Sequence, residues 1–490
     1  MQRLSLGTLP AASGEVTLPE LDPRSLPTGL VHLGIGAFHR AHQAVYTELA
    51  SAAGGDHRWG TFAVTGRSAN VVEQLAPQDC LYGVLTKSAD RTSLRVVGGI
   101  RDVVSGGAQQ GAAMTAIARP GVHVVTLTIT EKGYPRTADG ALALGTEPVT
   151  ADLAVVASVL AGRPAPHPTG TSLGLLAAGL ARRFAGGAEP LSVVSCDNLP
   201  GNGAQLERLV HELAASAGGD GFGTWLRERV TFPSTMVDRI VPATTDRDRA
   251  EAADLLHLRD HGLVVAEPFG QWVIEDRFAA DRPAWEDVGA TLATEVAPYE
   301  KAKLRMLNGT HSLLAYLGAL HGHRTIAEAV ADDTLYGAAR GLQQQDAIPT
   351  LEAPPGVDLA EYGEQILERF GNPHLRHTTV QVAMDGSQKL PIRILDTARD
   401  RLRAGAVPRH CALAVAAWIV YVHRGRDTTG RELPLNDPLA AVLRERAAGP
   451  TDGLVERMLQ IREIFDPEIA GQDVFRDAVR AEVAPLLQLQ

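Results

Sequence analysis

The chain has 490 residues, of which 45% are hydrophobic and 21% are charged. That length is too great for one ordinary core and predicts two or three domains, and the composition excludes a disordered chain. The formal net charge of −11, without any run of Lys and Arg, argues against a nucleic-acid-binding protein, which needs a clustered basic face.

The cysteines and the apolar runs in the sequence indicate the cellular compartment of the protein. Cys80, Cys196 and Cys411 lie far apart in the sequence, so we expect neither a disulfide framework nor a Cys-x-x-Cys zinc site. The N-terminal residues lack the pattern of a secretory signal, and no apolar run reaches the roughly 18 residues that a membrane span needs. We therefore expect a cytoplasmic protein that binds no membrane.

The first half of the chain alternates between strand-like and helix-like segments. A predicted strand in residues 29–36 ends in glycines and precedes a predicted helix over residues 41–52. Further short apolar runs follow at residues 60–65, 123–129 and 191–195, separated by segments rich in Ala, Leu and Gln. This alternation predicts a parallel α/β sheet in a doubly wound nucleotide-binding domain.

From about Tyr299 onward the pattern changes to Ala, Leu, Arg and Glu at helical spacing. The predicted helical segments are residues 301–320, 359–369, 411–422 and 454–464. The fold class expected is therefore α/β, with a Rossmann-type N-terminal domain over residues 1–290 and a mainly α-helical C-terminal domain over residues 291–490.

The glycine turn after the first strand is a candidate cofactor site. Gly34 and Gly36 match the first two glycines of a dinucleotide fingerprint, which allow a tight turn and a close approach of the backbone to the pyrophosphate. His39 stands where the third glycine is expected, so the pattern also fits an ordinary tight turn. We predict cofactor contacts from Gly34, Ile35, Gly36, Ala37, Phe38 and His39.

The sequence leaves open whether the cofactor is NAD or NADP. The acidic residue that usually holds the ribose hydroxyls is missing after the second strand, where Arg67 could instead meet the 2′-phosphate of NADP. We expect NAD, with NADP as the alternative. His39 and His42 could share a metal ion, but no third ligand stands at a suitable spacing. We expect these histidines to cap the helix and line the cofactor pocket, and we predict no metal site.

Residues 299–318 carry a second candidate site. At about 100° per residue, Lys303, His311 and Asn308 lie at about 0°, 80° and 140° around a helix axis, so one broad face can present all three. Oxidation of a secondary alcohol requires a base for the hydroxyl proton and donors for the developing oxyanion. A lysine beside apolar surface can have its pKa lowered by desolvation, which makes it a competent base without a metal.

Each of these side chains can be given its own role in the reaction. Lys303 would be the base, Asn308 and Asn198 the oxyanion donors, and Glu300 a holder or relay of the proton. His311 would position a substrate hydroxyl. The same pattern also fits a lysine that extends into solvent and a helix kink at Asn308, and both interpretations stay open on spacing alone.

Six ordered motifs resemble the polyol-specific long-chain dehydrogenases, the mannitol dehydrogenase family that includes mannitol 2-dehydrogenase and fructuronate reductase (D-mannonate oxidoreductase). They cover residues 34–43, 130–134, 195–200, 232–242, 269–276 and 303–311. The resemblance implies a metal-independent, NAD(P)-dependent hydride transfer with Lys303 as general acid/base, Asn198 and Asn308 as oxyanion donors, and His311 in substrate binding.

Further roles follow only from this resemblance. Asp238 matches a position near the nicotinamide and the substrate, Glu131 a position linked to proton exit, and Lys389 a position near the far end of the substrate. The expected partner is a small sugar alcohol, ketose or keto-uronate, of either the mannitol/fructose or the mannonate/fructuronate type. We expect a monomer or small homo-oligomer. The alternatives are a catalytically silent nucleotide-binding sensor and a zinc-dependent alcohol dehydrogenase.

Overall fold

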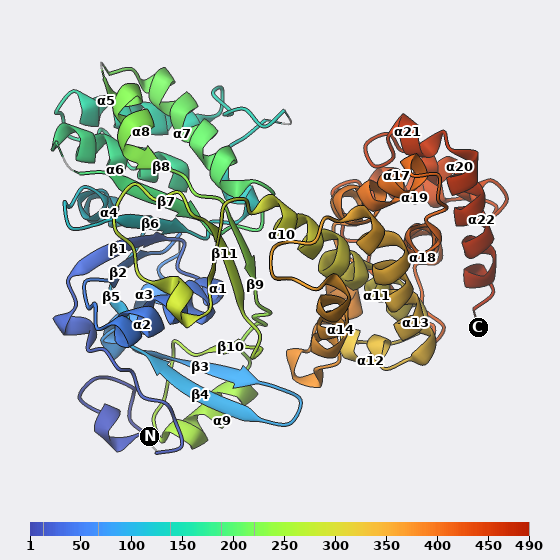
Figure 1. Ribbon diagram of the computed structural model, residues 1–490, viewed down its shortest axis with the longest axis horizontal. Helices are drawn as coiled ribbons and strands as arrows, with labels where there is room; N and C mark the ends of the chain where they lie inside the picture. The colour runs from blue at the N-terminus through green and yellow to red at the C-terminus, as the bar shows by residue number, and fades with distance from the viewer. Residues whose placement is uncertain (13, 67, 138, 188, 220, 490) are drawn as a thin grey trace. The chain divides into compact units, whose positions relative to one another are not determined.

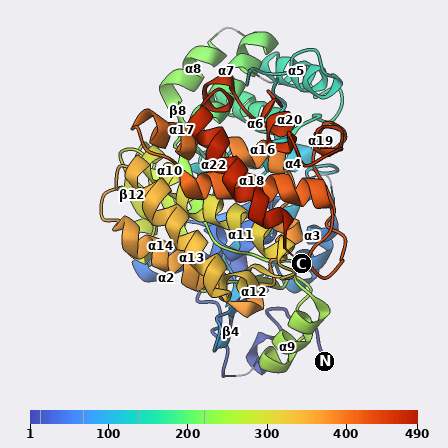
Figure 2. The same ribbon diagram turned by 90° about the vertical axis from the view of Figure 1, so that its right-hand side faces the viewer.

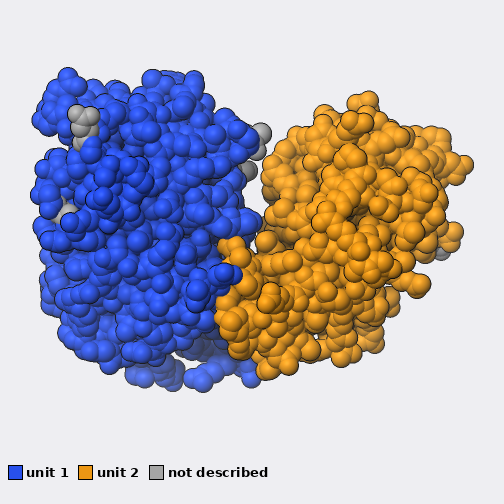
Figure 3. All heavy atoms as spheres, turned by 45° about the horizontal axis from the view of Figure 1, so that its top comes forward, with its two compact units in different colours: residues 1–296 blue, residues 297–490 orange. Residues whose placement is uncertain are grey.

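The structure, a computed structural model, describes residues 1–490 except residues 13, 67, 138, 188, 220 and 490. It contains two compact units, unit 1 (Met1–Val296) and unit 2 (Ala297–Gln490), coloured separately in Figure 3. The chain therefore divides after Val296, whereas we expected a boundary after residue 290. In the described part of the chain, no helix combines the length and apolar character that crossing a membrane requires.

Unit 1 is built on a six-stranded parallel sheet in the order β5-β2-β1-β6-β7-β8 (Figure 1). This order, counted along the chain as 3-2-1-4-5-6, is that of a Rossmann domain and confirms the expected fold class. The strands are β1 (Thr28–Leu33), β2 (Gly60–Val64), β5 (Ile100–Val104), β6 (Val124–Leu127), β7 (Leu191–Ser195) and β8 (Val230–Thr231).

Helices and smaller sheets cover the two faces of this sheet. The central strands are almost wholly buried, as expected for parallel strands with layers on both sides. The α-helices of unit 1 are α1 (Ala37–Ala41), α2 (Gln43–Gly54), α3 (Asn70–Leu75), α4 (Gln110–Ile117), α5 (Glu147–Leu160), α6 (Ser172–Ala185), α7 (Asn202–Ala217), α8 (Phe222–Arg229) and α9 (Asp246–Leu256). Its short 3₁₀ turns are η1 (Leu9–Ala11), η2 (Pro23–Ser25), η3 (Ala76–Gln78), η4 (Glu131–Gly133) and η5 (Trp285–Val288).

Two three-stranded sheets extend unit 1 beyond the sequence prediction. One joins β10 (Val264–Ala266), β3 (Tyr82–Lys87) and β4 (Thr92–Val97). The other joins β12 (Thr291–Ala293), β11 (Gln271–Glu275) and β9 (Thr235–Asp238), with β9 antiparallel to β11. The second sheet presents Asp238 at the end of β9.

Unit 2 is helical, as expected. Its α-helices are α10 (Ala297–Ala302), α11 (Gly309–Leu320), α12 (Ile326–Val330), α13 (Asp333–Gly341), α14 (Leu359–Phe370), α15 (Thr379–Val382), α16 (Gly386–Leu390), α17 (Asp396–Arg403), α18 (Arg409–Arg424), α19 (Ala440–Ala447), α20 (Leu454–Leu459), α21 (Pro467–Ala470) and α22 (Asp473–Leu487). Three π-helical segments interrupt them, η6 (Lys303–Asn308), η7 (Leu342–Ala347) and η10 (Pro391–Leu395), and 3₁₀ turns occur at η8 (Ile348–Thr350) and η9 (Pro373–Leu375).

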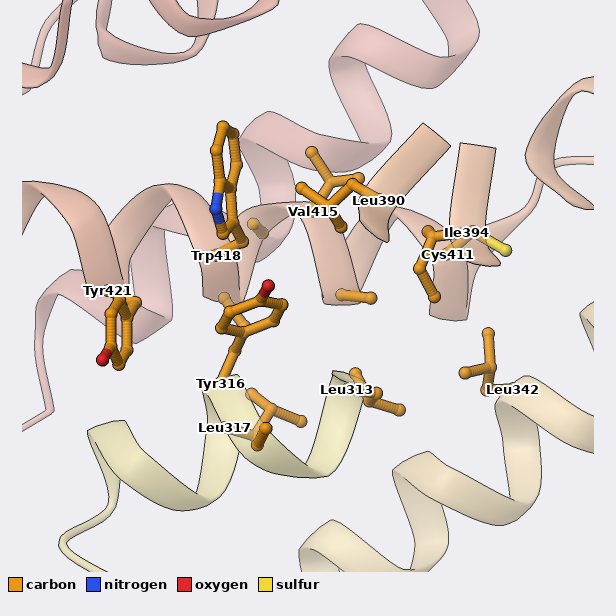
Figure 4. Close-up of a cluster of buried hydrophobic side chains, with 14 of the residues drawn as sticks. Leu313, Tyr316, Leu317, Leu342, Leu390, Ile394, Cys411, Val415, Trp418 and Tyr421 are labelled. Carbon is orange, nitrogen blue, oxygen red and sulfur yellow. The ribbon is translucent and has the colours of Figure 1, made fainter. Parts of the chain in front are cut away.

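The core of unit 2 lies between α11 and α18. Tyr316 and Leu317 of α11 face Val415 and Trp418 of α18, and side chains from α16 and η10 close one side of the cluster (Figure 4). Helix α18 is apolar around most of its circumference because α22 packs on it as well (Figure 2). This packing fixes α11, the helix that continues the candidate catalytic segment.

Candidate active site

The glycine turn joins β1 to α1 in unit 1. Gly34 has a φ of +98°, and a Cβ atom at this position would lie 2.2 Å from the carbonyl oxygen of Thr128. The amides of Gly34 and Ile35 both donate to the carbonyl of Val64, which holds the turn over the end of β2. Gly36 is the residue before α1, and a Cβ there would meet only the carbonyl of Gly34, at 3.7 Å. The backbone conformation and the contact with Thr128 therefore require glycine at position 34, whereas the space around Gly36 would admit a Cβ atom.

His39 occupies the place of the third fingerprint glycine inside unit 1. Its buried ring stacks on that of His32 in β1, with 3.3 Å between centroids. His32 bridges Thr126 and Thr128, and the Thr128 hydroxyl donates to the carbonyl of Gly34 at 2.8 Å. Burial lowers the pKa of His32 to about 3 and that of His39 well below its usual value, so both rings stay neutral. Through Thr128, the stacked rings of His32 and His39 thus support the glycine turn from the buried interior of unit 1.

His42 stands at the cap position between α1 and α2, but neither histidine caps a helix through its side chain. Neither α1 nor α2 receives a side-chain cap, because the His39 ring packs into the interior and the His42 ring turns toward β11. His42 Nε2 lies 2.9 Å from the carbonyl oxygen of Gln271, and its ring stacks on Phe38. Among the described residues, no group of three or more His, Cys, Asp or Glu side chains could hold a metal ion.

A cavity of about 820 Å³ opens at the carboxyl ends of the strands of unit 1. Thr65 and Gly66 after β2, Gly106 after β5, and Ile129 and Thr130 after β6 line it. In doubly wound sheets, this edge near the reversal of strand order is where dinucleotides bind. Its size and place fit a nicotinamide dinucleotide, although residues 34–39 of the glycine turn are not among the residues that line it. Arg67, expected at this edge, lies outside the described residues.

The loop after β7 carries Asn198, which is exposed. Asn202 fixes this loop, because its side-chain amide donates to the carbonyls of Asp197 and Thr235, both at 2.9 Å, and its Oδ1 accepts from the Thr235 amide. Thr235 begins β9, whose last residue is the buried Asp238. Within unit 1, Asn202 therefore ties the Asn198 loop to the strand of Asp238.

A buried carboxylate joins the same loop to the turn after β6. Asp197 accepts hydrogen bonds from the Thr130 amide and the Tyr134 hydroxyl, both at 2.7 Å. Thr130 has a φ of +66°, a conformation that residues other than glycine seldom adopt. Burial raises the pKa of Asp197 to about 6 despite both donors. Glu131, exposed at the start of η4, follows directly on this anchored turn.

The catalytic candidates of unit 2 lie on one helix with a π-helical interruption. Lys303 begins η6 and Asn308 ends it, and the amide of Gly309 donates to the carbonyl of Leu304, five residues back. The uniform 100° spacing expected for this segment is therefore wrong. Residues five apart in a π-helix stand about one turn apart, so Asn308 lies closer in angle to Lys303 than the predicted 140°. π-Helical turns inside α-helices occur frequently at functional sites.

Glycine 309 allows the second π-helical segment to approach this turn. A Cβ atom on Gly309 would lie 3.0 Å from the carbonyl oxygen of Arg393 in η10. The Arg393 guanidinium donates to the hydroxyl of Ser312 in α11, at 3.3 Å. The close backbone packing thus brings a cationic side chain beside the helix of Asn308 and His311.

Three polar atoms on this helix are buried without a hydrogen-bond partner among the described residues: Asn308 Nδ2, Thr310 Oγ1 and His311 Nε2. Asn308 and His311 are three residues apart where α11 begins, so their side chains are neighbours on the helix surface. A buried donor without a partner costs free energy that native proteins usually avoid, unless a ligand supplies the partner. The pair therefore has the character of a substrate contact.

Positive and imidazole groups surround His311 in unit 2. Its ring stacks on that of Phe370, with 4.7 Å between centroids, and on that of His377, with 5.5 Å between centroids. Burial lowers the pKa of His311 well below its usual value, and His377, Arg393, Lys389 and Arg369 lower it further. Burial and then the charge of Arg393 lower the pKa of Lys389 to about 8.

The remaining expected residues of unit 2 lie at separate places. Glu300 is half-buried in α10, one turn before the half-buried Lys303. Lys389 lies in α16 and donates to the carbonyl of Val382, at 3.1 Å. The structure thus places His311 on the same helix as Asn308 and within the electrostatic influence of Lys389, whereas Asn198, Asp238 and Glu131 belong to unit 1.

Sequence reasoning missed several residues of these sites. Asp197 and Tyr134 stood inside motifs that we had noted, yet only tertiary contacts reveal their hydrogen bond. Arg369 lies in α14, Arg393 in η10 and His377 in the loop before α15, and their positions have no common spacing, so no sequence signal could join them to His311.

The comparisons with known proteins can be set against this geometry. The family model of the mannitol dehydrogenase Rossmann domain matches residues 28–287, and that of the mannitol dehydrogenase C-terminal domain matches residues 295–487. The chain belongs to the mannitol dehydrogenase family. It is 40% identical to a D-mannonate oxidoreductase of Escherichia coli over 485 residues, which cover 96% of each chain.

Two mannitol enzymes are similar as well. A mannitol 2-dehydrogenase of Cereibacter sphaeroides is 36% identical over 475 residues, again 96% of each chain. The structure of Pseudomonas fluorescens mannitol 2-dehydrogenase, a ternary complex with NAD and D-mannitol, matches with a TM-score of 0.85 and 33% identity, over 99% of this chain and 97% of that one. The expected family and enzyme class, a dehydrogenase with a dinucleotide-binding Rossmann domain, are confirmed, and so is a nicotinamide cofactor at the level of the family.

Proposed function

We propose that this protein is a metal-independent, NAD-dependent dehydrogenase that interconverts a secondary alcohol of a polyol or aldonate with the corresponding ketone. The observation that carries the proposal is the pair of buried, unpartnered atoms Asn308 Nδ2 and His311 Nε2 on one face of the helix that begins with Lys303. Membership of the mannitol dehydrogenase family, and the NAD in the related mannitol enzyme, support it.

A nicotinamide cofactor would supply the hydride acceptor or donor when bound, and the side chains of the chain manage the proton and the charge. Lys303 takes the hydroxyl proton during oxidation and returns it during reduction. The amide groups of Asn308 and Asn198 donate to the oxygen as its negative charge develops. His311 holds a neighbouring substrate hydroxyl through Nε2.

Three further residues complete the proposal. Glu300 stands one helical turn before Lys303 and is assigned to proton relay with Glu131, while Asp238 is assigned to the reacting end of the cofactor and substrate. Gly34, Ile35, Gly36, Ala37, Phe38 and His39 form the turn assigned to the dinucleotide. NAD rather than NADP is assigned from the related complex, and assays with NADH and NADPH decide between them.

The test is the variant Asn308→Ala assayed by NADH oxidation with D-fructose and D-fructuronate. Loss of one oxyanion donor should lower kcat by about 10²- to 10³-fold with a much smaller change in KM. Thr310→Val is the matched control, because the Thr310 hydroxyl is also buried but stands two residues further on, toward another face of the helix. A kcat for Asn308→Ala equal to that of the control would exclude Asn308 from the reaction.

A further inference from the structure

The loop after β7 presents Asn198 at the centre of a three-residue turn. Asn198 is exposed, whereas Asp197 and Leu199 on either side of it are buried. The amide of Leu199 donates to the carbonyl of Asp197 at 2.9 Å, which closes the turn around Asn198. A hydrogen-bond donor stabilises a developing charge best when its place is fixed before the reaction begins. The exposed Asn198 therefore depends on the backbone that carries it.

The side chain of Asn202, at the start of α7, holds the peptide group that precedes Asn198. Its amide nitrogen donates to the carbonyl of Asp197 at 2.9 Å. Because a peptide unit is planar, fixing this carbonyl fixes the plane to which the amide nitrogen of Asn198 belongs. The same side-chain nitrogen donates to the carbonyl of Thr235, and Oδ1 accepts from the Thr235 amide, both at 2.9 Å. Both donors of the buried Asn202 amide are thus engaged by the backbone.

Strand β9, which Thr235 begins, supplies a fixed frame for these bonds. It pairs with β11 over its whole length and is buried throughout (Figure 1). The Thr235 hydroxyl donates to the carbonyl of Ser195, the last residue of β7, at 2.6 Å. A Cβ atom on Gly203 would lie 2.5 Å from the carbonyl oxygen of Phe232, so the first turn of α7 packs directly against the chain that enters β9. Asn202 therefore ties the Asn198 turn to elements that are already fixed.

We propose that Asn202 is a positioning residue for the reaction, and that its side-chain amide holds Asn198 where Asn198 donates to the reacting oxygen of the substrate. Asn202 acts through Asn198, since its own donors are engaged by the carbonyls of Asp197 and Thr235. Without this amide the turn can shift, and a displacement of about 1 Å in a positioned group can lower turnover by about 10²-fold. The inference rests on the proposed function, because it concerns the oxyanion donor of that dehydrogenase.

The variant Asn202→Ala tests the proposal in steady-state assays of NADH oxidation with D-fructose and D-fructuronate. On the ketose that the wild-type enzyme reduces, kcat should fall by about 10- to 100-fold. KM for that ketose and the affinity for NADH should change by less than about threefold, because Asn202 positions a group that acts chiefly in the transition state.

A double-mutant cycle with Asn198→Ala separates positioning from a general effect on the fold. Asn198→Ala alone should lower kcat by about 10²- to 10³-fold. Adding Asn202→Ala to that variant should lower kcat further by less than about threefold, because the donor that Asn202 holds has already been removed. A further loss of about 10- to 100-fold in the double variant would overturn the proposal.

Gln78→Ala is the matched control, because Gln78 is also a buried side-chain amide of unit 1. Its Nε2 donates to the carbonyl of Leu81 and to the carboxylate of Asp260, and its Oε1 accepts from the His261 amide. Thermal unfolding followed by circular dichroism should show similar falls in Tm for Gln78→Ala and Asn202→Ala, since each loses the same kinds of hydrogen bond. Gln78→Ala should nevertheless keep kcat within about threefold of the wild type.

A conservative variant keeps the test decisive. Asn202→Ser retains one hydroxyl donor and should lose less kcat than Asn202→Ala, and the cycle is measured with Asn202→Ser if Asn202→Ala does not fold. Equal losses of kcat in Gln78→Ala and the Asn202 variant would attribute the effect to stability and overturn the positioning role.

The failures of the two proposals differ. Unchanged kcat in Asn202→Ala, beside a full loss in Asn198→Ala, would overturn the positioning role and leave the proposed dehydrogenase intact. Unchanged kcat in Asn198→Ala would remove the donor, and with it the role of Asn202. An enzyme that binds NADH but reduces neither ketose would overturn the proposed function and the positioning role together.

Discussion

Replacing Gly34 with alanine should destabilise unit 1. The added methyl group would lie 2.2 Å from the carbonyl oxygen of Thr128, and the φ of +98° is one that alanine seldom adopts. Backbone strain of this kind costs about 1–3 kcal/mol, and overpacking against a backbone atom costs about 1–3 kcal/mol more. A combined loss of about 4 kcal/mol is therefore expected.

Thermal unfolding measures this loss. An unfolding entropy of about 2.1 cal/mol/K per residue gives unit 1 about 0.6 kcal/mol/K, so Gly34→Ala should lower the Tm of that unit by about 6 °C. The assay is differential scanning calorimetry of the purified full chain without cofactor, with NADH affinity measured in parallel by fluorescence titration.

Gly36→Ala is the matched control, and it should have the opposite profile. Its Cβ would meet only the carbonyl of Gly34 at 3.7 Å, so the Tm should change by less than about 2 °C. NADH affinity should nevertheless fall by about tenfold or more, because the second fingerprint glycine lets the pyrophosphate approach the backbone. Equal Tm values for the two variants would refute the reasoning about Gly34, and unchanged NADH affinity in Gly36→Ala would remove this turn from the cofactor site.

Three further predictions concern the reaction and the fold. Lys303→Met should lower kcat by about 10²- to 10⁴-fold with NADH affinity retained, measured by steady-state kinetics and fluorescence titration, and near-normal turnover would remove Lys303 from the mechanism. Incubation with EDTA should leave activity unchanged, whereas a loss restored by added zinc would establish a metal enzyme. Burial raises the pKa of Glu48 to about 7, although its carboxylate accepts a hydrogen bond from the Gly98 amide. The contribution of this raised pKa to the free energy of unfolding, about 3 kcal/mol, is complete below about pH 4.5 and is lost as the pH rises to about 7. In Glu48→Gln that loss should disappear from the Tm measured between pH 5 and 8, and an identical pH profile in both proteins would contradict the assignment.

Local patterns in the sequence determined much of the fold. Buried parallel strands are short apolar runs, so residues 191–195 were predicted with the bounds that β7 has, and β1, β2 and β6 were displaced by only a few residues. The apolar run 411–422 became the buried centre of α18 for the same reason. The segment 454–464 became a helix only as far as Leu459, because spacing alone does not mark a helix end.

Spacing and resemblance in the sequence also predicted which side chains form the candidate site, and these assignments remain proposals. Lys303, Asn308 and His311 lie near one another in the chain, and a helix converts that proximity into a shared face. The sequence prediction missed the two small sheets of unit 1. In one of them β10 pairs with β3, a strand more than a hundred residues away, and no local pattern marks such a pairing.

Only the tertiary structure decided how the side chains of the sites are positioned and which charges surround them. The π-helical turn at residues 303–308 changed the angle between Lys303 and Asn308, and the local sequence did not predict this turn. Burial raised the pKa of Asp197, and His311 acquired its cationic surroundings from Arg369, Lys389 and Arg393, which lie on three segments that meet only in the folded unit. Burial and electrostatic environment depend on neighbours distant in the chain, so the sequence determined which chemical groups are present, and packing decided what each of them can do.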